Sequence, residues 1–313
     1  MENDIMVSVY CLAYNHEKYI RSALDGFVMQ KTDFKYEVLV HDDASTDGTA
    51  QIIREYAKKY PEIIKPIYQT ENQYSKGINV TKSFVIPRIL GRYVAICEGD
   101  DYWTDDMKLQ RQYDAMEKHS EVDICAHSSI KVRAKDEKVI SYICPESREC
   151  VIDLGKVISG GGGFVATNSL FFRRELFEIE PDFRKQCPYD YALQIQGALR
   201  GGMLYLPYNM SAYRIGVPGS WTSRMAAKEY NDSQQRIIIK MLDMVNEETL
   251  GRYCKIIERA KLDVEFDSLE LAGKYKELRK GNLRKLYKER NFKWKIKMYL
   301  KEYYIYLVKL FGK

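Results

Sequence analysis

The chain has 313 residues, 45% of them hydrophobic and 30% charged, a composition that excludes a disordered or fibrous protein and predicts a folded core. Its seven scattered cysteines include no Cys-x-x-Cys pair, so the sequence predicts neither a disulfide framework nor a zinc site. The start of the chain lacks a signal-peptide pattern, and no uncharged apolar run reaches the length of a membrane span, so we expect a cytoplasmic protein.

Strands and helices alternate in the first part of the chain. Short apolar runs predict strands at 6–13, 36–40, 63–68 and 93–96. Apolar residues at helical spacing predict helices around 20–28, 52–57 and 79–90, although Pro87 weakens the last. We expect Asn15 to cap the first helix, and Asp43 or Ser45 to cap the second. This alternation predicts an α/β fold with a mainly parallel sheet and helices on both faces.

The pattern changes after a helix expected at about 104–119. Strands are predicted at 122–130, 139–143, 166–173 and 203–208, with a glycine loop at 160–163 and a helix after Pro188. Such a mixture predicts a small antiparallel portion added to the parallel sheet. From about Ala226 the pattern is helical, so we predict one domain over 1–225 and a helical extension over 226–313.

An acidic run follows the strand predicted at 93–96. Glu98, Asp100 and Asp101 fall within four residues, at the strand's C-terminal end, where open α/β sheets bind ligands. Carboxylates this close repel one another unless a cation or hydrogen-bond donors lie among them, and hard ions such as Mg²⁺ or Mn²⁺ prefer oxygen ligands. The alternative is a solvated acidic turn that caps the helix starting near Thr104.

A second acidic pair, Asp42-Asp43, ends the strand predicted at 36–40. A carboxylate there can accept a hydrogen bond from the imide N–H of uracil, or it can cap the next helix. The chain has no G-x-G-x-x-G and no G-x-x-x-x-G-K-[ST] phosphate loop. A bound nucleotide must therefore be held by side chains and a metal.

Together, three segments resemble family 2 glycosyltransferases: Ala13-Tyr14-Asn15, the V-H-D-D-A-S-T-D-G-T run at 40–49, and the E-G-D-D-Y-W run at 98–103. The resemblance covers about residues 5–220. It implies the Rossmann-like GT-A fold and a metal-dependent, inverting sugar transfer. It also implies a nucleotide-binding half over 1–103 and an acceptor half over 104–225.

The resemblance implies which residues hold the donor nucleotide. Tyr14 and Asp43 take the positions that bind the nucleobase, with Ala13 and Asn15 in the same motif. Asn72 and Gly77 resemble the loop near the phosphates and the donor sugar. Lys76 in that loop pairs with phosphate or is simply an exposed surface lysine.

For the acidic run, the resemblance implies a division of roles. Asp100 takes the metal-binding position, for Mn²⁺ or Mg²⁺, and Asp101 supports it. Glu98 stands where relatives more often carry Asp, and its longer arm contacts the ribose or a metal-bound water. Gly99 lies between Glu98 and Asp100.

The catalytic base of the family is a carboxylate at the start of a late helix. Pro188-Tyr189-Asp190-Tyr191 matches that setting, which makes Asp190 the predicted base, and flanking tyrosines are expected to desolvate it and raise its pKa. Its plain alternative is a helix cap. The segment Y-R-h-x-x-x-x-S-W at 213–221 places Arg214 where it reaches the diphosphate or organises a closing loop.

Other features leave open alternatives. Gly216 stands where many relatives carry a histidine, so a third, imidazole metal ligand is not expected there. Trp103 packs in the core or lines the acceptor site, and Trp221 lines the acceptor site. The glycine loop at 160–163 moves over the donor or is a simple turn.

The chain's basic charge lies in its tail. Between Lys274 and Lys313 there are 14 Lys/Arg and 3 Asp/Glu, interleaved with aromatic and aliphatic residues. Such a basic amphipathic segment suits an anionic membrane surface, so we expect a peripheral location on the inner face of the membrane. The alternative is a helical appendage packed on the protein itself or on a partner; no motif indicates nucleic-acid binding.

The predicted function is an inverting transfer of a sugar from a nucleotide donor, UDP-linked by preference, to a saccharide or lipid-linked acceptor. The expected setting is synthesis of bacterial capsule, exopolysaccharide or lipopolysaccharide. The alternatives are a sugar nucleotidyltransferase and a non-catalytic module that binds nucleotide sugars or glycans. A nucleotidyltransferase needs a glycine-rich phosphate loop after the first strand, which Ala13-Tyr14-Asn15-His16-Glu17 does not provide.

Overall fold

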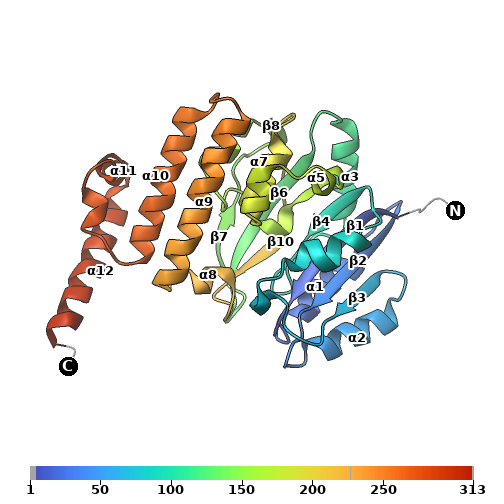
Figure 1. Cartoon of the computed structure of the whole chain (residues 1–313). Helices are drawn as coiled ribbons and strands as arrows, with labels where there is room; N and C mark the ends of the chain where they lie inside the picture. Colours follow the sequence, from blue (N-terminus) through green and yellow to red (C-terminus); the bar gives the residue numbers. More distant parts are fainter. Residues whose placement is uncertain (1–4, 226, 312–313) are drawn as a thin grey trace. The chain divides into compact units, whose positions relative to one another are not determined.

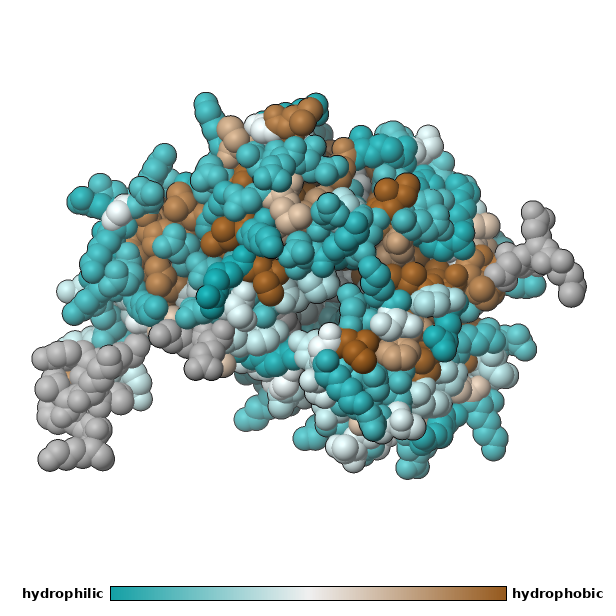
Figure 2. Space-filling model, viewed as in Figure 1, coloured by the Kyte–Doolittle hydropathy of each residue, from teal (hydrophilic) through white to brown (hydrophobic). Residues whose placement is uncertain are grey.

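The computed structural model describes residues 5–225 and 227–311, coloured along the chain in Figure 1. Their contacts divide the chain into two compact units, Met1–Val217 and Pro218–Lys313. Within the described residues, no helix is both long enough and apolar enough to cross a membrane. Hydrophilic residues cover most of the face seen in Figure 2, and hydrophobic ones form small patches.

Unit 1 is organised on a ten-stranded sheet in which β3-β2-β1-β4-β9-β6-β10-β5 are successive neighbours. Its first four strands are parallel and lie close to their predicted positions: β1 (Ile5–Ala13), β2 (Lys35–Asp42), β3 (Ile64–Tyr68) and β4 (Tyr93–Ile96). Buried apolar residues fill both faces of β1 and β2, as expected for central parallel strands.

The second half of unit 1 adds the antiparallel portion. Its strands are β5 (Tyr102–Trp103), β6 (Ile124–Arg133), β7 (Val139–Ile143), β8 (Cys150–Ile152), β9 (Phe171–Arg173) and β10 (Met203–Ile215). β9 is antiparallel to both β4 and β6, and so joins the two parts of the sheet. β10 is parallel to β6 and runs beyond the strand predicted at 203–208, which puts Arg214 on a strand.

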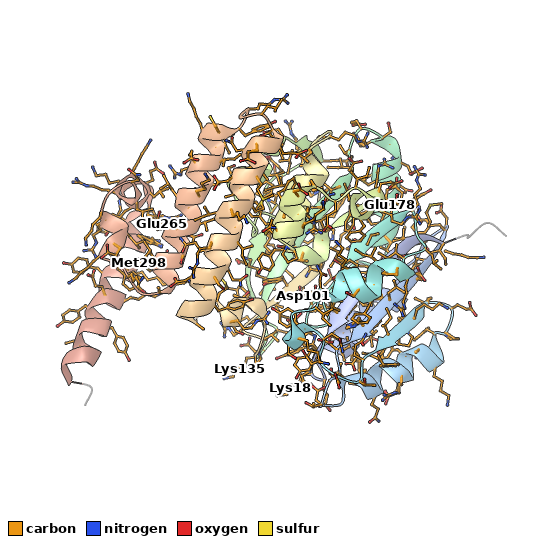
Figure 3. The ribbon with its side chains drawn as sticks, in the orientation of Figure 1. Lys18, Asp101, Lys135, Glu178, Glu265 and Met298 are labelled. Carbon is orange, nitrogen blue, oxygen red and sulfur yellow. The ribbon has the colours of Figure 1, made fainter. Side chains whose placement is uncertain are left out.

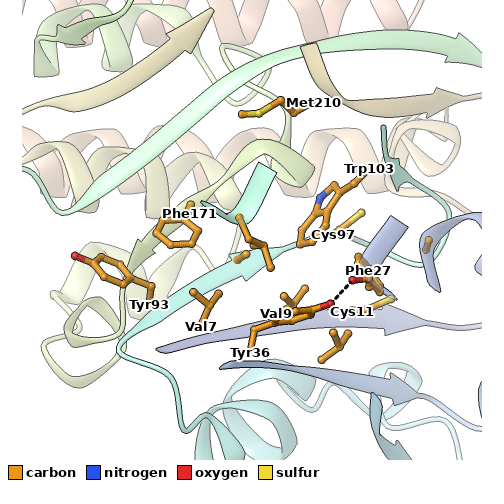
Figure 4. Packing of buried hydrophobic residues seen from close by; sticks show 14 of the residues in the cluster. Val7, Val9, Cys11, Phe27, Tyr36, Tyr93, Cys97, Trp103, Phe171 and Met210 are labelled. Carbon is orange, nitrogen blue, oxygen red and sulfur yellow. Dashed lines mark hydrogen bonds between the residues drawn. The ribbon is translucent and has the colours of Figure 1, made fainter. Parts of the chain in front are cut away.

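Helices cover both faces of the sheet, as predicted. On one face, α1 (Ile20–Val28), α2 (Thr49–Lys59) and α3 (Lys108–Lys118) bury their apolar positions against inward residues of β1, β2 and β4, the cluster seen in Figure 4. On the other face, the Tyr10 ring lies 6.5 Å from the Phe177 ring. The α-helices between β8 and β10 are α4 (Leu154–Gly160), α5 (Glu175–Glu178), α6 (Asp182–Gln186) and α7 (Asp190–Ala198).

Several local predictions were wrong. Asn15 does not cap α1, and neither Asp43 nor Ser45 caps α2, because Asn15 and Ser45 hydrogen-bond to one another's loops; at the start of α2 the Asp47 carboxylate accepts from the Thr49 N–H at 3.0 Å instead. The segment around 79–90 is not one α-helix: a π-helical turn over Thr81–Val85 is followed by a 3₁₀ turn over Ile86–Arg88, where Pro87 cannot donate a backbone hydrogen bond. The helix expected from Thr104 begins only at Lys108, because Tyr102–Trp103 pairs with β10.

Unit 2 is helical throughout its described part. It contains α8 (Trp221–Arg224), α9 (Lys228–Glu248), α10 (Cys254–Leu271), α11 (Leu283–Glu289) and α12 (Phe292–Phe311), with a 3₁₀ turn at Glu277–Arg279. Its core gathers buried residues from α10, the segment that follows it, the 3₁₀ turn, α11 and α12, namely Phe266, Tyr275, Leu278, Leu283, Leu286 and Met298.

A fully buried lysine lies under the sheet's acidic edge. Lys108 donates to the Gln112 side chain at 2.6 Å, and its ammonium lies 4.0 Å from the centre of the Trp103 ring. Burial lowers the pKa of Lys108 to about 7. In the unfolded chain the same group has a pKa of about 10.4.

This lysine makes stability depend on pH. Between about pH 7 and 10 the unfolded chain binds a proton at Lys108 that the folded chain does not, so its contribution to the free energy of unfolding rises with pH. We predict that Lys108→Met removes this rise and narrows the difference between urea midpoints at pH 7 and pH 9. Equal pH dependence in both proteins would show that Lys108 is not the group responsible.

Candidate active site

Three loops meet at the C-terminal edge of the parallel strands. Ala13 at the end of β1 pairs with Asp42 at the end of β2, and Tyr10 pairs with Ile96 at the end of β4. The loops that carry Tyr14, Asp43 and the acidic run therefore leave the sheet at neighbouring points. The predicted nucleotide residues come together for this topological reason.

The loop after β1 is fixed to the loop after β2. The backbone N–H of Asn15 donates to Ser45 Oγ at 2.9 Å, and Asn15 Oδ1 accepts from the N–H of Thr46 at 2.8 Å. Asn15 has φ 56°, a left-handed conformation that asparagine tolerates. Ala13 is buried beneath them, whereas Tyr14 is 44% exposed. Its ring therefore offers an apolar face at the edge of the sheet.

Asp43 organises the predicted phosphate loop. Its Oδ1 accepts from the N–H of Gln73 at 2.8 Å and its Oδ2 from the N–H of Tyr74 at 3.0 Å. The Asn72 amide donates to the backbone carbonyl of Asp43 at 3.2 Å. Both residues thus hold the loop over 72–77 against β2, a role that the sequence analysis did not predict.

The remaining residues of that loop are exposed. Lys76 forms an ion pair with Glu71, which the sequence analysis did not anticipate. Gly77 has φ 76°, and a β-carbon there would meet no atom within 4 Å, so its requirement for glycine is conformational rather than steric.

The acidic run turns sharply after β4. The N–H of Asp101 donates to the Glu98 carbonyl at 3.1 Å, and the N–H of Gly99 donates to the Leu12 carbonyl of β1 at 2.9 Å. A β-carbon on Gly99 would lie 2.8 Å from His16 Nδ1, so only glycine fits this crossing. His16, to which the sequence analysis gave no role, is therefore part of the wall behind the acidic run.

Asp101 is the buried anchor of the run, and it is labelled in Figure 3. Its Oδ1 accepts from the backbone N–H of Arg214 at 2.8 Å, and its Oδ2 accepts from the Asn168 amide at 3.0 Å. Burial and the neighbouring Asp100 raise the pKa of Asp101 well above its ordinary range. The carboxylate thus joins the loop after β4 to β10. This contact is the way in which Asp101 would support Asp100.

Arg214 supports the same loop from β10. Its Nη1 donates to the Asp100 carbonyl at 2.7 Å and its Nε to Glu137 Oε1 at 2.8 Å. The guanidinium lies 4.3 Å from the centre of the Tyr102 ring. Because Arg214 is buried and committed to these partners, its position favours the loop-organising alternative over direct contact with a diphosphate.

Asp190 is the first residue of α7, and Tyr189 rather than Asp190 occupies the cap position. Its Oδ2 accepts a hydrogen bond from the Thr167 hydroxyl. Burial raises the pKa of Asp190, while the Thr167 hydroxyl and the charge of Arg184 oppose the shift. A β-carbon on Gly162 would lie 3.9 Å from Asp190 Oδ1, so the glycine loop borders this carboxylate.

Glu98 and Asp190 line one cavity of about 150 Å³. Its wall also includes Tyr10 from β1, Lys82 from the π-helical turn and Arg184 from α6. Burial and the nearby carboxylates of Asp100 and Asp190 raise the pKa of Glu98 to about 8. The acidic run and the predicted base therefore face the same space.

The link between these two parts is the 3₁₀ turn Thr167–Ser169, which the sequence analysis read as part of a strand. Thr167 binds Asp190, and the next residue, Asn168, binds Asp101. The Asn168 amide also donates to the Ala212 carbonyl at 3.0 Å, and its Oδ1 accepts from Ser211 Oγ at 2.6 Å. The one sequence signal for these contacts was Asn168 itself, a polar residue within the apolar strand predicted at 166–173.

Trp103 takes the first of its two predicted alternatives, packing in the core, and does not line an acceptor site. Trp103 is only 2% exposed, its ring packs edge-on against Phe27 at 4.9 Å, and its Nε1 donates to the Asn168 carbonyl at 3.0 Å. The core-packing alternative is therefore correct. Trp221 begins α8 in unit 2, and its side chain lies outside the described residues.

The acidic run suits a divalent cation that is completed by its substrate. Within residues 5–225 and 227–311, no three His, Cys, Asp or Glu side chains converge as a preformed metal cage. Mg²⁺-type sites in enzymes of phosphate chemistry often use only one or two carboxylates plus substrate phosphates. Arg214 binds the backbone carbonyl of Asp100 and not its carboxylate, which accepts no hydrogen bond from the described residues, so this side chain fits such an ion.

Comparison with known proteins defines the family. Residues 8–180 match the family model described as Glycosyl transferase family 2. Rv1520 of Mycobacterium tuberculosis, described as uncharacterized, is 37% identical over 218 residues, which are 69% of this chain and 61% of that protein. The chain belongs to glycosyl transferase family 2, and it spans less than two thirds of the length of this relative.

Solved structures share the fold. S. aureus TarS in complex with UDP-GlcNAc has a TM-score of 0.62 at 16% identity, over 85% of this chain and 81% of that one. The mannosyltransferase PcManGT from Pyrobaculum calidifontis, in complex with GDP-Man and Mn²⁺, has a TM-score of 0.55 at 16% identity, over 98% and 87%. The predicted GT-A fold is thus confirmed.

Removing the Asn168 amide is predicted to destabilise unit 1. Asn168→Ala removes one buried partner of the Asp101 carboxylate, which keeps the Arg214 N–H, and one of the Ser211 hydroxyl, which keeps Ser129 Oγ; we expect a cost of about 2 kcal/mol in total. The midpoint of urea unfolding, followed by circular dichroism, measures the loss. Asn282→Ala is the matched control, because Asn282 is exposed and makes no capping bond. Equal midpoints for the two variants would contradict the bracing role of Asn168.

Proposed function

We propose that the chain is an inverting, metal-dependent glycosyltransferase that moves a sugar from a nucleoside diphosphate to a hydroxyl group. The observation that carries the proposal is the shared cavity of Glu98 and Asp190, with Asp100 in the same loop as Glu98. Family membership supports sugar transfer as the reaction. The acceptor we favour is a saccharide or a lipid-linked glycan of a bacterial capsule, exopolysaccharide or lipopolysaccharide.

The donor is held by the ends of β1 and β2. The exposed Tyr14 ring stacks on the nucleobase, and Asp43 lies beside it with lone pairs that its two backbone donors leave free. An acceptor-only carboxylate suits the imide N–H of uracil, so UDP is the favoured nucleotide. Asn72, Lys76 and Gly77 form the neighbouring loop over the phosphates.

Transfer needs one base on the acceptor side. Asp190 accepts the proton of the attacking hydroxyl, and the Thr167 hydroxyl holds its Oδ2 so that Oδ1 points toward the acceptor. Asp100 would hold a divalent ion, Mn²⁺ or Mg²⁺, whose positive charge would stabilise the departing nucleoside diphosphate. Glu98 binds the ribose or a metal-bound water. Asp101, Asn168 and Arg214 keep the loop in place beneath them.

Two substitutions separate binding from chemistry. Asp100→Asn is expected to abolish the Mn²⁺-dependent part of UDP binding, measured by titration calorimetry. Asp190→Asn is expected to keep that binding and to lower the release of UDP from a UDP-sugar by about 10²- to 10⁴-fold. Asp114→Asn, on the exposed side of α3, is the matched control and retains full activity.

Full turnover by Asp190→Asn would remove Asp190 as the base. UDP binding without any donor turnover, across a panel of UDP- and GDP-sugars, would instead favour a non-catalytic binding module.

The activity should be lost on the acid side. Asp190 acts as a base only when deprotonated, and burial raises its pKa, so the rate rises with pH through a value above the ordinary aspartate range of about 4. Thr167→Val removes a hydrogen bond that lowers this pKa, so it shifts the acid limb of kcat/KM to higher pH, whereas Thr167→Ser leaves the limb in place. An unshifted limb in Thr167→Val would show that Thr167 does not tune the base.

A further inference from the structure

The last helix of unit 2 packs through one side only. Met298 is buried in the core of the unit, and the Trp294 ring lies 5.7 Å from Phe266 and 5.8 Å from Tyr287. Glu302 on the same side forms an ion pair with Arg279. Met298, which is labelled in Figure 3, marks this packed side of α12.

The opposite side of α12 carries large apolar and aromatic side chains that are largely exposed in the described part of unit 2, although Tyr299 at its edge also has the Arg279 guanidinium 5.5 Å from its ring centre. They recur at helical spacings of three and four residues, and each is between 44% and 76% exposed. We name this set the apolar stripe: Phe292, Ile296, Tyr299, Leu300, Tyr303 and Tyr304. At 1.5 Å per residue, the stripe runs for about 18 Å along the helix. Because these side chains are exposed, the apolar stripe is not part of the core of unit 2.

Lysines flank the apolar stripe. Lys293, Lys297 and Lys301 are exposed and recur every four residues, which aligns them along one border of the stripe; we name them the lysine row. Lys295 lies on the other border. Glu302, the acidic residue of α12, is already neutralised by Arg279. The exposed part of α12 is therefore apolar in the middle and positive at its borders.

We propose that this face of α12 docks on an anionic membrane surface, with the helix axis in the plane of the interface. Tyrosine and tryptophan rings favour the water–lipid boundary, and lysine ammonium groups bind anionic headgroups while their stems lie along apolar surface. A second copy of the chain fits less well, because two facing stripes would bring their lysine rows together. The proposal refines the expectation of a basic membrane-binding tail to one face of one helix, and it does not depend on the catalytic residues.

Vesicle flotation tests the proposal with the full chain. The chain is expected to float with vesicles of phosphatidylcholine containing phosphatidylglycerol, and to bind vesicles of phosphatidylcholine alone far more weakly. Replacing the lysine row, Lys293→Glu, Lys297→Glu and Lys301→Glu, should weaken binding by about a hundredfold or more, since each lysine near an anionic surface contributes substantially. The triple variant Tyr299→Ser, Leu300→Ser and Tyr303→Ser should abolish flotation. High salt should weaken the binding of the native chain.

The matched control reverses three exposed lysines elsewhere in unit 2: Lys255→Glu, Lys274→Glu and Lys276→Glu. It changes the net charge of the chain by the same amount as the lysine-row variant, so it should retain most of the binding. Equal loss in both charge variants would overturn the proposal in favour of a non-specific charge effect. Absence of flotation by the native chain, or a dimer that becomes monomeric when the stripe is replaced, would overturn it in favour of protein contact.

Discussion

The site depends on the buried carboxylate of Asp101. A carboxylate inside a protein is stable only when donors surround it, and here the donors are the Asn168 amide and the backbone N–H of Arg214. These two bonds fix the acidic run against β10 and against the 3₁₀ turn Thr167–Ser169. Because Thr167 in the same turn binds Asp190, one three-residue turn sets the separation between the acidic run and the proposed base.

Three further carboxylates lie close together at the proposed site: Glu98 and Asp190 line the cavity, and Asp100 lies in the same loop as Glu98. Glu98, Asp100 and Asp190 repel one another and are partly withdrawn from water, which raises the pKa of Glu98 to about 8. Arg214 does not neutralise them, since its charge is paired with Glu137. Arg184 in the cavity wall offsets part of this repulsion at Asp190, and a cation bound at Asp100 would offset more of it.

Much of this could be predicted from the sequence, because the parallel strands and their end motifs are local patterns. The edge of the sheet, with Tyr14, Asp43, Glu98 and Asp100, follows from strand order, whereas Asp190, the first residue of α7, was predicted only from the family resemblance. The bracing contacts could not be predicted, because Asn168 and Asp101 lie 67 residues apart and meet only after β9 joins the two parts of the sheet. For Trp103 the sequence left core packing and an acceptor site as alternatives, because its place in the core depends on the pairing of Tyr102–Trp103 with β10.

The most direct test is a crystal structure of the chain with UDP and Mn²⁺, with the metal located by its anomalous signal. The account predicts a peak beside the Asp100 carboxylate, bridged to the diphosphate, with the uracil against Tyr14 and open space between the diphosphate and Asp190. A metal peak away from the acidic run, or UDP bound outside the C-terminal edge of β1, β2 and β4, would contradict it.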